Sequence, residues 1–201
     1  MHSANVVTRP NHTPITPGRG DRYDRRPMPV DATPRSTVNV RLATLADAPA
    51  VRAIYNVEVN EYTSTFDLVP RTLDQQRTWL AERSGAFSAV VATLDADPGQ
   101  VVGFAALSPY KERAAYRTTV ENSVYVSREH SGLGIGSTLM RHLIDVARES
   151  GFHSVVARIE ASSEASRALH TSVGFDLVGV EREVGRKFNR WLSVAVMQLM
   201  L

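Results

Sequence analysis

The spacing of apolar residues divides the chain into predicted strands and helices. Alternating or continuous apolar runs predict seven strands, at about residues 38–43, 87–94, 101–107, 119–127, 153–160, 175–184 and 191–201. Apolar residues three and four positions apart predict four helices, at about residues 48–59, 73–83, 137–150 and 163–172. This order of elements predicts one domain of mixed α/β type built on a single sheet.

Local signals mark where several elements begin and end. Asp47 is expected to cap the first helix, residues 95–99 have the composition of a turn between two strands, and Gly151 is expected to end the third helix. One side of that third helix is apolar and predicts its buried face: Leu139, Leu143, Ile144, Val146 and Ala147.

The first 36 residues differ in composition from the rest. They hold six of the ten prolines and almost no periodic apolar pattern, so they cannot bury enough surface to offset the entropy of ordering. We therefore expect a disordered tail at 1–36 and a folded domain at 37–201. An organelle-import leader is the alternative for this arginine-rich segment, although its three aspartates and its prolines fit that poorly.

Charge and composition exclude several classes of function. Six arginines and three aspartates give the first 36 residues a charge of +3, which leaves 2 − 3 = −1 for the domain and argues against nucleic-acid binding. The absence of cysteine excludes disulfides, thiolate catalysis and cysteine-based zinc sites. No apolar run approaches the ~20 residues of a membrane span, and the start lacks the pattern of a signal peptide. We expect a cytoplasmic protein that needs no metal.

The stretch 121–137 carries the main chemical signal. A strand containing Val124, Tyr125 and Val126 passes into glycines at 132, 134 and 136, and a helix follows at once. Such a turn directs unpaired backbone N–H groups and the positive end of the helix dipole at one point, which suits a phosphate or pyrophosphate. The spacing fits neither a Rossmann motif nor a P-loop. A tight turn with no ligand is the alternative.

This stretch resembles the acetyl-CoA-binding motif of the GNAT superfamily of N-acetyltransferases, Arg/Gln-x-x-Gly-x-Gly/Ala. Here the motif is Ser131-Gly-Leu-Gly-Ile-Gly136, with serine in place of the usual Arg or Gln. The resemblance implies the GNAT fold, a mixed and mostly antiparallel twisted sheet whose central strands splay apart, flanked by helices. It also implies acetyl-CoA as cosubstrate.

Three further segments resemble one branch of that superfamily, the phosphinothricin and methionine sulfoximine/sulfone acetyltransferases. They are residues 111–127, residues 63–66 and the run Ser166-Arg-Ala-Leu-His-Thr-Ser-Val-Gly-Phe175. The resemblance implies transfer to the amine of a small amino-acid-like compound, and a homodimer. Arg117 departs from the branch, which has an acidic residue there, and this puts the exact substrate in doubt.

Within this resemblance, Glu121 and His170 are the candidate catalytic residues. A partly desolvated Glu121 would accept the proton of the amine, and His170 would protonate the departing thiolate. The alternatives are a solvated glutamate at a strand edge and a packed or surface histidine. With no cysteine, transfer is expected to be direct, in a ternary complex.

Two further groups have expected binding roles: the resemblance implies the first, and charged or aromatic side chains suggest the second, with solvated surface as the alternative for each charge. The first is expected to hold acetyl-CoA: Val124, Tyr125, Val126, Gly132, Leu133, Gly134, Ile135, Gly136, Ser137 and Ser163, where the family usually has asparagine in place of the last. The second is expected to bind the acceptor: Tyr62, Phe66, Lys111, Arg113 and Tyr116. Two other functions stay open, acetylation of a protein or peptide and a non-catalytic module that binds acyl-CoA.

Overall fold

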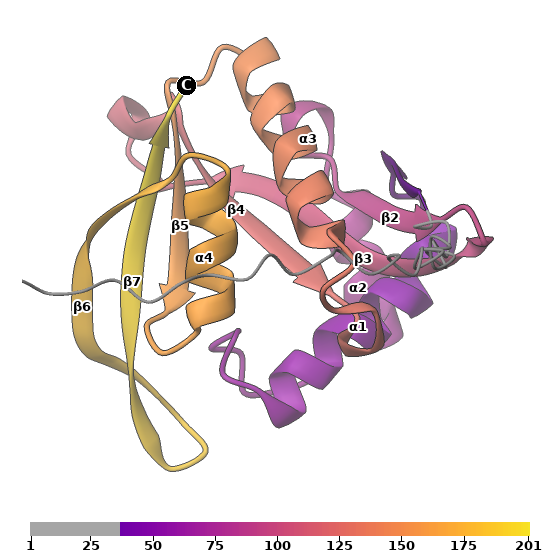
Figure 1. The fold of residues 1–201 in the computed structure, drawn as a ribbon, viewed down its shortest axis with the longest axis horizontal. Coiled ribbons are helices and arrows are strands. Elements are labelled where there is room, and N and C mark those ends of the chain that lie inside the picture. The colour runs from indigo at the N-terminus through magenta and orange to yellow at the C-terminus, as the bar shows by residue number, and fades with distance from the viewer. Residues whose placement is uncertain (1–36) are drawn as a thin grey trace, which may run out of the picture. The chain divides into compact units, whose positions relative to one another are not determined.

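The computed structural model describes residues 37–201, and the predicted tail at 1–36 lies outside the described residues. Within that range the elements occur in the predicted order (Figure 1). The strands are β1 (Val38–Leu42), β2 (Val90–Leu94), β3 (Asp97–Pro109), β4 (Thr119–Val126), β5 (Ser154–Glu160), β6 (Asp176–Lys187) and β7 (Arg190–Met200). The helices are α1 (Ala48–Glu61), α2 (Leu73–Ala81), α3 (Ile135–Glu149) and α4 (Glu164–Ser172).

The strands form one mixed sheet in the order β1-β2-β3-β4-β5-β7-β6. β4 and β5 run parallel, and the other neighbouring pairs among these strands are antiparallel. This agrees with the expected mixed, mostly antiparallel sheet. The parallel pair, β4 and β5, lies near the middle of the sheet, with antiparallel pairs on both sides.

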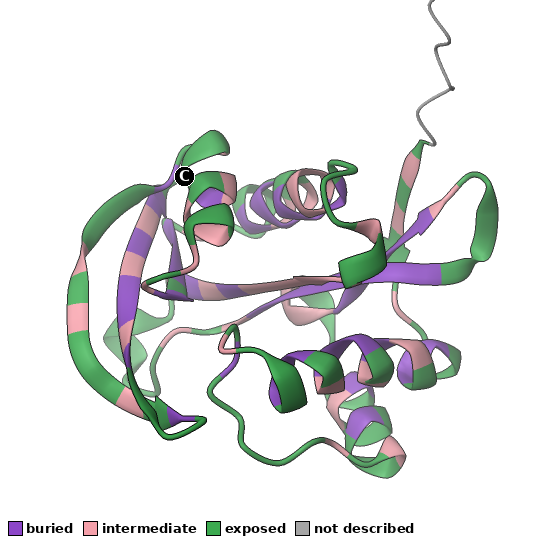
Figure 2. Cartoon of the chain, turned by 60° about the horizontal axis from the view of Figure 1, so that its bottom comes forward, coloured by how far each residue is buried: buried purple, intermediate pink, exposed green. Residues whose placement is uncertain are grey.

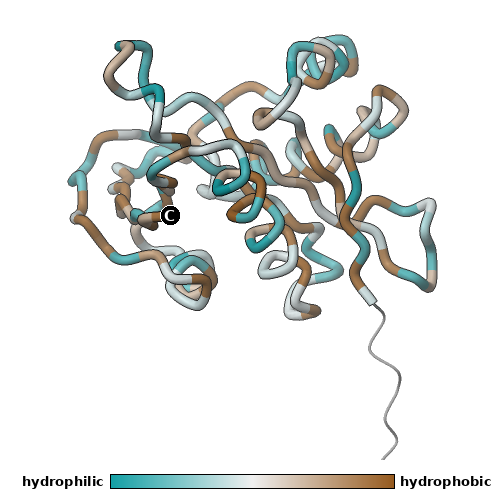
Figure 3. The backbone as a smooth tube through the Cα atoms, turned by 90° about the horizontal axis from the view of Figure 1, so that it is seen from above, coloured by the Kyte–Doolittle hydropathy of each residue, from teal (hydrophilic) through white to brown (hydrophobic). Residues whose placement is uncertain are grey.

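Helices cover both faces of the sheet (Figure 2). On one face α3 lays its apolar side on the central strands, where Leu139, Leu143 and Ala147 are buried as predicted. On the other face α1 and α2 pack over β2 and β3, with Val51 and Tyr55 against Phe104. Apolar stretches run through the sheet and hydrophilic ones through the loops (Figure 3). Among residues 37–201, no helix has both the length and the apolar character to cross a bilayer.

The ends of several elements differ from the expectation. β3 begins at Asp97, so the turn after β2 shortens to residues 95–96, and β6 continues to Lys187 through a polar run that hides its strand character. Asp47 does precede α1, but its carboxylate makes no cap bond; it accepts two hydrogen bonds from the Arg41 guanidinium, each 2.8 Å long. Gly151 follows the end of α3 with φ +75°, as expected of a C′ glycine.

Candidate active site

The two central strands separate at one end and leave a cavity between them. β4 pairs with β5 only from Thr119 to Glu121, opposite Ser154 to Val156, and both strands then continue apart. The opening holds a cavity of about 130 Å³. Side chains of both strands and of α4 meet there, among them Glu121, Asn122, Arg158, Glu160, Ser163 and His170. Beyond Glu121, the edge of β4 that faces β5 has backbone groups free to bind a ligand.

Glu121 lies where β4 leaves β5, and its side chain lines the cavity. Surrounding protein atoms remove the carboxylate from water and raise its pKa, while the positive charge of Arg158 lowers it to a smaller extent. A carboxylate with a raised pKa is a better proton acceptor than an exposed one. This position and this environment would suit a general base.

His170 also lines the cavity, and both nitrogens of its ring have hydrogen-bond partners. Its Nδ1 lies 2.8 Å from the carbonyl oxygen of Ser166 and donates to it, and its Nε2 lies 3.0 Å from Asn122 Nδ2, from which it accepts. Burial lowers the pKa of His170, and the ring packs edge-on against Phe175. In this arrangement Nε2 carries no proton that it could give to a thiolate.

The glycine turn forms the N-terminal end of α3 at a second, larger cavity. This cavity has a volume of about 530 Å³ and is lined by Ser131, Gly132 and residues 134–137 of the turn and helix. Gly132 and Gly134 have φ of +81° and +80°, a backbone conformation that residues other than glycine rarely adopt. Leu133 is exposed and lies outside the lining.

The residues present fit the pyrophosphate and pantetheine of coenzyme A. A Cβ on Gly132 or Gly134 would meet open space, so the turn leaves room at the first turn of α3. The N–H groups of that turn have no intrahelical partner, and the dipole of this 15-residue helix adds positive charge there. Among residues 37–201, Glu58 is the one acidic residue that lines the groove, and its charge is balanced by its ion pair with Arg128.

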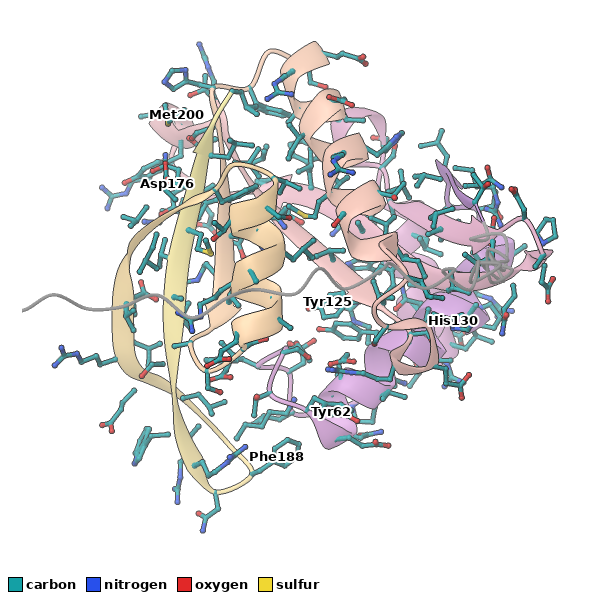
Figure 4. The ribbon with its side chains drawn as sticks, viewed as in Figure 1. Tyr62, Tyr125, His130, Asp176, Phe188 and Met200 are labelled. Atoms are coloured by element: carbon teal, nitrogen blue, oxygen red, sulfur yellow. The ribbon has the colours of Figure 1, made fainter. Side chains whose placement is uncertain are left out.

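The two cavities adjoin along β4 and α4. Val124, Tyr125, Ser163 and Ser166 line both of them, together with Ser64 from the loop after α1. Tyr125 lies at the centre of the molecule, between α4 and α1 (Figure 4), where it stacks on Phe104, and burial raises its pKa. A ligand that extends from the α3 terminus along β4 would therefore reach the cavity that holds Glu121.

The five residues expected to bind the acceptor do not line this cavity. Tyr62 stacks against the Arg128 guanidinium at 3.8 Å, and Phe66 packs against Gly185 in β6. Lys111 lies over the rings of Tyr110 and Tyr116, and Arg113 precedes the short 3-10 turn that contains Tyr116. We call the segment 111–117 the rim, because it lies outside the lining but the charge of Lys111 acts on Glu181, the partner of Arg158.

Two charged residues of β5, Arg158 and Glu160, line the cavity, and neither was predicted from the sequence. Arg158 binds Glu181 of β6 through two hydrogen bonds, of 3.2 and 2.5 Å. Glu160 is buried and accepts hydrogen bonds from the backbone and hydroxyl of Ser162, and a longer one of 3.4 Å from Thr63. Alternating charges on a strand next to Glu121 were the available signal, but they looked like a solvated strand face.

The loop that carries Ser64 is tied to the rest of the site by buried charges. The carboxylate of Glu58, at the end of α1, accepts hydrogen bonds from Ser64 and from Arg128, the latter with a Nε–Oε1 distance of 2.7 Å. Lys187, at the end of β6, is buried and donates to the carbonyl oxygens of Glu58 and Thr65 at 3.1 and 2.8 Å. The loop is thus fixed from α1, from the segment after β4 and from β6.

Comparisons with known proteins agree with this architecture. The chain matches the model of the acetyltransferase (GNAT) family over residues 51–175. It is 37% identical over 165 residues to an L-methionine sulfoximine/L-methionine sulfone acetyltransferase of Pseudomonas paraeruginosa, which covers 82% of this chain and 95% of that protein.

Two solved structures illustrate the likeness of fold. A phosphinothricin acetyltransferase from Sinorhizobium meliloti, in complex with acetyl-CoA, superimposes with a TM-score of 0.78 at 34% identity and covers 82% of this chain and 89% of its own. A ribosomal-protein-alanine N-acetyltransferase from Brucella melitensis gives 0.78 at 41% identity, and covers 81% of this chain and 99% of its own. Together with the splayed sheet, these matches identify the chain as a member of the acetyltransferase (GNAT) family and as an N-acetyltransferase.

Proposed function

We propose that this N-acetyltransferase moves the acetyl group of acetyl-CoA to the amine of a small amino-acid-like acceptor, of the phosphinothricin or methionine sulfoximine/sulfone type. The observation that carries the proposal is the continuity of the two cavities. The groove at the α3 terminus leads along β4 into a cavity of about 130 Å³ that contains Glu121. The relatives that act on such acceptors align with four fifths of the chain.

In this proposal the backbone holds the cosubstrate. The N–H groups of residues 134–137 bind the pyrophosphate, and the free edge of β4 at Val124–Val126 pairs with the pantetheine as an added strand would. Ser163, which lines both cavities at the start of α4, contacts the pantetheine from the other side. Acetyl-CoA, when bound, supplies an acyl group activated as a thioester.

Glu121 accepts the proton of the acceptor ammonium, directly or through one water molecule. Its partial burial raises its pKa, so the pKa of Glu121 is closer to that of the amine than the pKa of an exposed glutamate would be. A backbone N–H near Val126 stabilises the negative charge that develops on the carbonyl oxygen. The two cavities share five lining residues, so each substrate has a cavity beside the other, and this supports direct transfer in a ternary complex.

In this scheme His170 holds Asn122 in place and does not serve as the general acid for the thiolate. Its Nε2 accepts a hydrogen bond from the Asn122 amide, and its Nδ1 proton is engaged by Ser166, so the pair holds the part of β4 next to Glu121. The departing thiolate is then protonated by water or by the proton that leaves the amine. This replaces the acid role expected from the resemblance.

The experiment is a measurement of thiol release from acetyl-CoA with a panel of acceptors. The panel contains phosphinothricin, methionine sulfoximine, methionine sulfone, ordinary amino acids and a peptide library. Turnover that is fastest on the first three, with initial-rate lines that intersect when both substrates are varied, supports the proposal. Parallel lines would contradict the ternary complex, and turnover on peptides alone would contradict the acceptor class.

Acetylation of a protein N-terminus is the second candidate, and the 41% identity to the Brucella enzyme favours it. A peptide needs an open groove for several residues, whereas the cavity beside Glu121 has a volume of only about 130 Å³. The small acceptor is therefore the better fit. The peptide arm of the same panel separates the two candidates.

The finer points of assembly and location are part of the proposal. β6 and β7 expose Leu177, Val178, Val180 and Trp191, and such apolar surface on an edge strand suits contact with a second copy of the chain. We expect a cytoplasmic homodimer. Sedimentation at micromolar concentration should give twice the mass of the chain; a monomer at all concentrations would reject the dimer.

A further inference from the structure

We infer that Arg158 binds the carboxylate of the acceptor and thereby selects compounds that carry a carboxylate next to the reacting amine. The inference rests on the proposed function and adds a residue that determines specificity. Arg158 takes no part in proton transfer in this account. Its role is to hold the acceptor by the group beside the amine that Glu121 deprotonates.

The register of the sheet places Arg158 beside Glu121. Glu121 pairs with Val156, and Arg158 is two residues further along β5, so both charged side chains project from the same face of the sheet. Both line the cavity of about 130 Å³. They are close enough for the Arg158 charge to lower the pKa of Glu121. A cation and a proton acceptor that face one small cavity match the two charged groups of an α-amino acid.

The present partner of Arg158 is one that a ligand can replace. Glu181 accepts hydrogen bonds end-on from Nη1 and Nη2 of the guanidinium, which leaves the Nε–H side without this partner, and the pair is solvent-exposed, with side-chain exposures of 36% and 42%. Exposed pairs of this kind contribute little stability. A ligand carboxylate offers the same two-oxygen geometry from the cavity side, where water is partly excluded.

The basic residues at the rim are less suited to this task. Lys111 lies over two tyrosine rings, 4.7 and 5.2 Å from their centres, and neither it nor Arg113 lines the cavity. Lys111 is near enough for its charge, with that of Arg158, to lower the pKa of Glu181. Of these three basic residues, only Arg158 lines the cavity.

The first test compares Arg158→Ala with wild type on two matched acceptors. One is the amino acid that wild type acetylates best, and the other is the same compound with its carboxylate removed. Losing a charge-assisted hydrogen bond should raise KM for the amino acid by roughly 10- to 100-fold, with kcat changed by no more than about threefold. KM for the decarboxylated amine and for acetyl-CoA should stay at the wild-type value, and Arg158→Lys should recover part of the loss.

Two further variants sharpen the test. Arg77→Ala removes an exposed arginine of α2 whose partner, Asp74, lies far from the cavity, and should change neither KM. Glu181→Gln removes the competing carboxylate, and should lower KM for the amino acid by about two- to fivefold. Thermal melting of every variant must match wild type within a few degrees, so that a KM change reports binding.

Three results would overturn the inference. Equal losses of Arg158→Ala on both acceptors would mean that Arg158 supports the site and does not read the carboxylate. A selective loss in Lys111→Ala, absent in Arg158→Ala, would move the carboxylate site to the rim. If wild type acetylates peptides and no amino acid, the proposed function is wrong as well. If wild type acetylates amino acids and Arg158→Ala changes KM equally for the amino acid and the decarboxylated amine, only the inference is wrong.

Discussion

Two opposing influences act on the pKa of Glu121, and in the proposed function their balance sets the pH at which the enzyme works. Burial raises its pKa above the ordinary 4.5, and Arg158 partly offsets this. A general base must be ionised, so kcat/KM should fall as the pH drops through the raised pKa. The free-enzyme profile should therefore show an acid limb above pH 4.5 that depends on Glu121.

The same balance predicts a shift in a variant. Arg158→Ala removes the positive charge that favours the carboxylate, so the acid limb should move to higher pH. Measuring kcat/KM against pH with a decarboxylated acceptor avoids the effect on acceptor binding. A limb that stays in place or moves to lower pH would contradict the electrostatic contact between the two residues.

His170 should prove to be a positioning residue. Since its Nε2 carries no proton, His170→Gln should lower kcat by less than about tenfold and leave the alkaline limb of the pH profile unchanged. Asn122→Ala should cause a loss of similar size, because both changes break the same contact. If kcat fell by 10²-fold or more in His170→Gln but not in Asn122→Ala, and the alkaline limb disappeared, His170 would be the general acid.

How far the sequence predicts the site differs from residue to residue. Glu121 was predicted because the segment 119–126 that contains it resembles one branch of the family, and its side chain does line the cavity. Arg158 and Glu160 were missed, since alternating charges on a strand also describe a solvated face. Lys111 was assigned to the acceptor from its position in the chain alone, and nothing in the sequence shows that two tyrosine rings hold it at the rim.

At the level of the element, a substitution at Gly134 tests whether the N-terminal end of α3 binds acetyl-CoA, because this residue has a positive φ. Gly134→Ala forces a side chain into φ +80°, which costs about 1–2 kcal/mol of stability, and disturbs the N–H groups of the first turn. KM for acetyl-CoA should rise by roughly tenfold.

The same helix provides the control. Gly151 follows the other end of α3 with φ +75° and also has nothing within 4 Å of an added Cβ. Gly151→Ala should therefore cost a similar amount of stability, read from chemical denaturation, and leave KM for acetyl-CoA unchanged. Equal effects of the two variants on KM would show that the terminus at Gly134 does not bind the cosubstrate.

The elements themselves were predicted well because their apolar periods are clear, above all in α3. Their ends were predicted less well where polar residues belong to regular structure. β6 continues to Lys187 because an edge strand needs no buried face, and the positive φ of Phe188 and Asn189 forms the turn to β7. Asp47 was expected to cap α1, but Arg41, a tertiary partner that the local pattern does not reveal, binds its carboxylate.

At the scale of the whole molecule, Lys187 connects the β6–β7 hairpin to the loop that lines the site. Its ammonium is buried and donates to two carbonyl oxygens, and this desolvation lowers its pKa. Lys187→Met keeps the aliphatic stem and leaves those oxygens unpaired, so the free energy of unfolding should fall by about 1–3 kcal/mol. The loop with Ser64 should also gain amide hydrogen exchange.

Arg182→Met is the matched control, because it removes a charge from an exposed position of the same strand. It should change unfolding by less than about 0.5 kcal/mol and leave exchange in the loop as it is. If both variants behave alike, Lys187 does not hold the hairpin to the loop.

The layered arrangement could be predicted only in part. Apolar periods indicate that helices cover a sheet, but they do not show that β4 and β5 are parallel neighbours or that they separate after Glu121. The resemblance to a family implied only that the central strands splay apart, and the pairing itself is seen in the structure. The separation decides the function, because it creates both the cavity and the free edge of β4.

The most direct test of this account is the acetyl-transfer rate of Glu121→Gln compared with wild type, measured with saturating acetyl-CoA and the best amino-acid acceptor. We predict a fall in kcat of about 10²- to 10⁴-fold with the affinity for acetyl-CoA, measured by calorimetry, unchanged. A variant that turns over at the wild-type rate would contradict the central claim, that the carboxylate at the opening between β4 and β5 takes the proton from the amine.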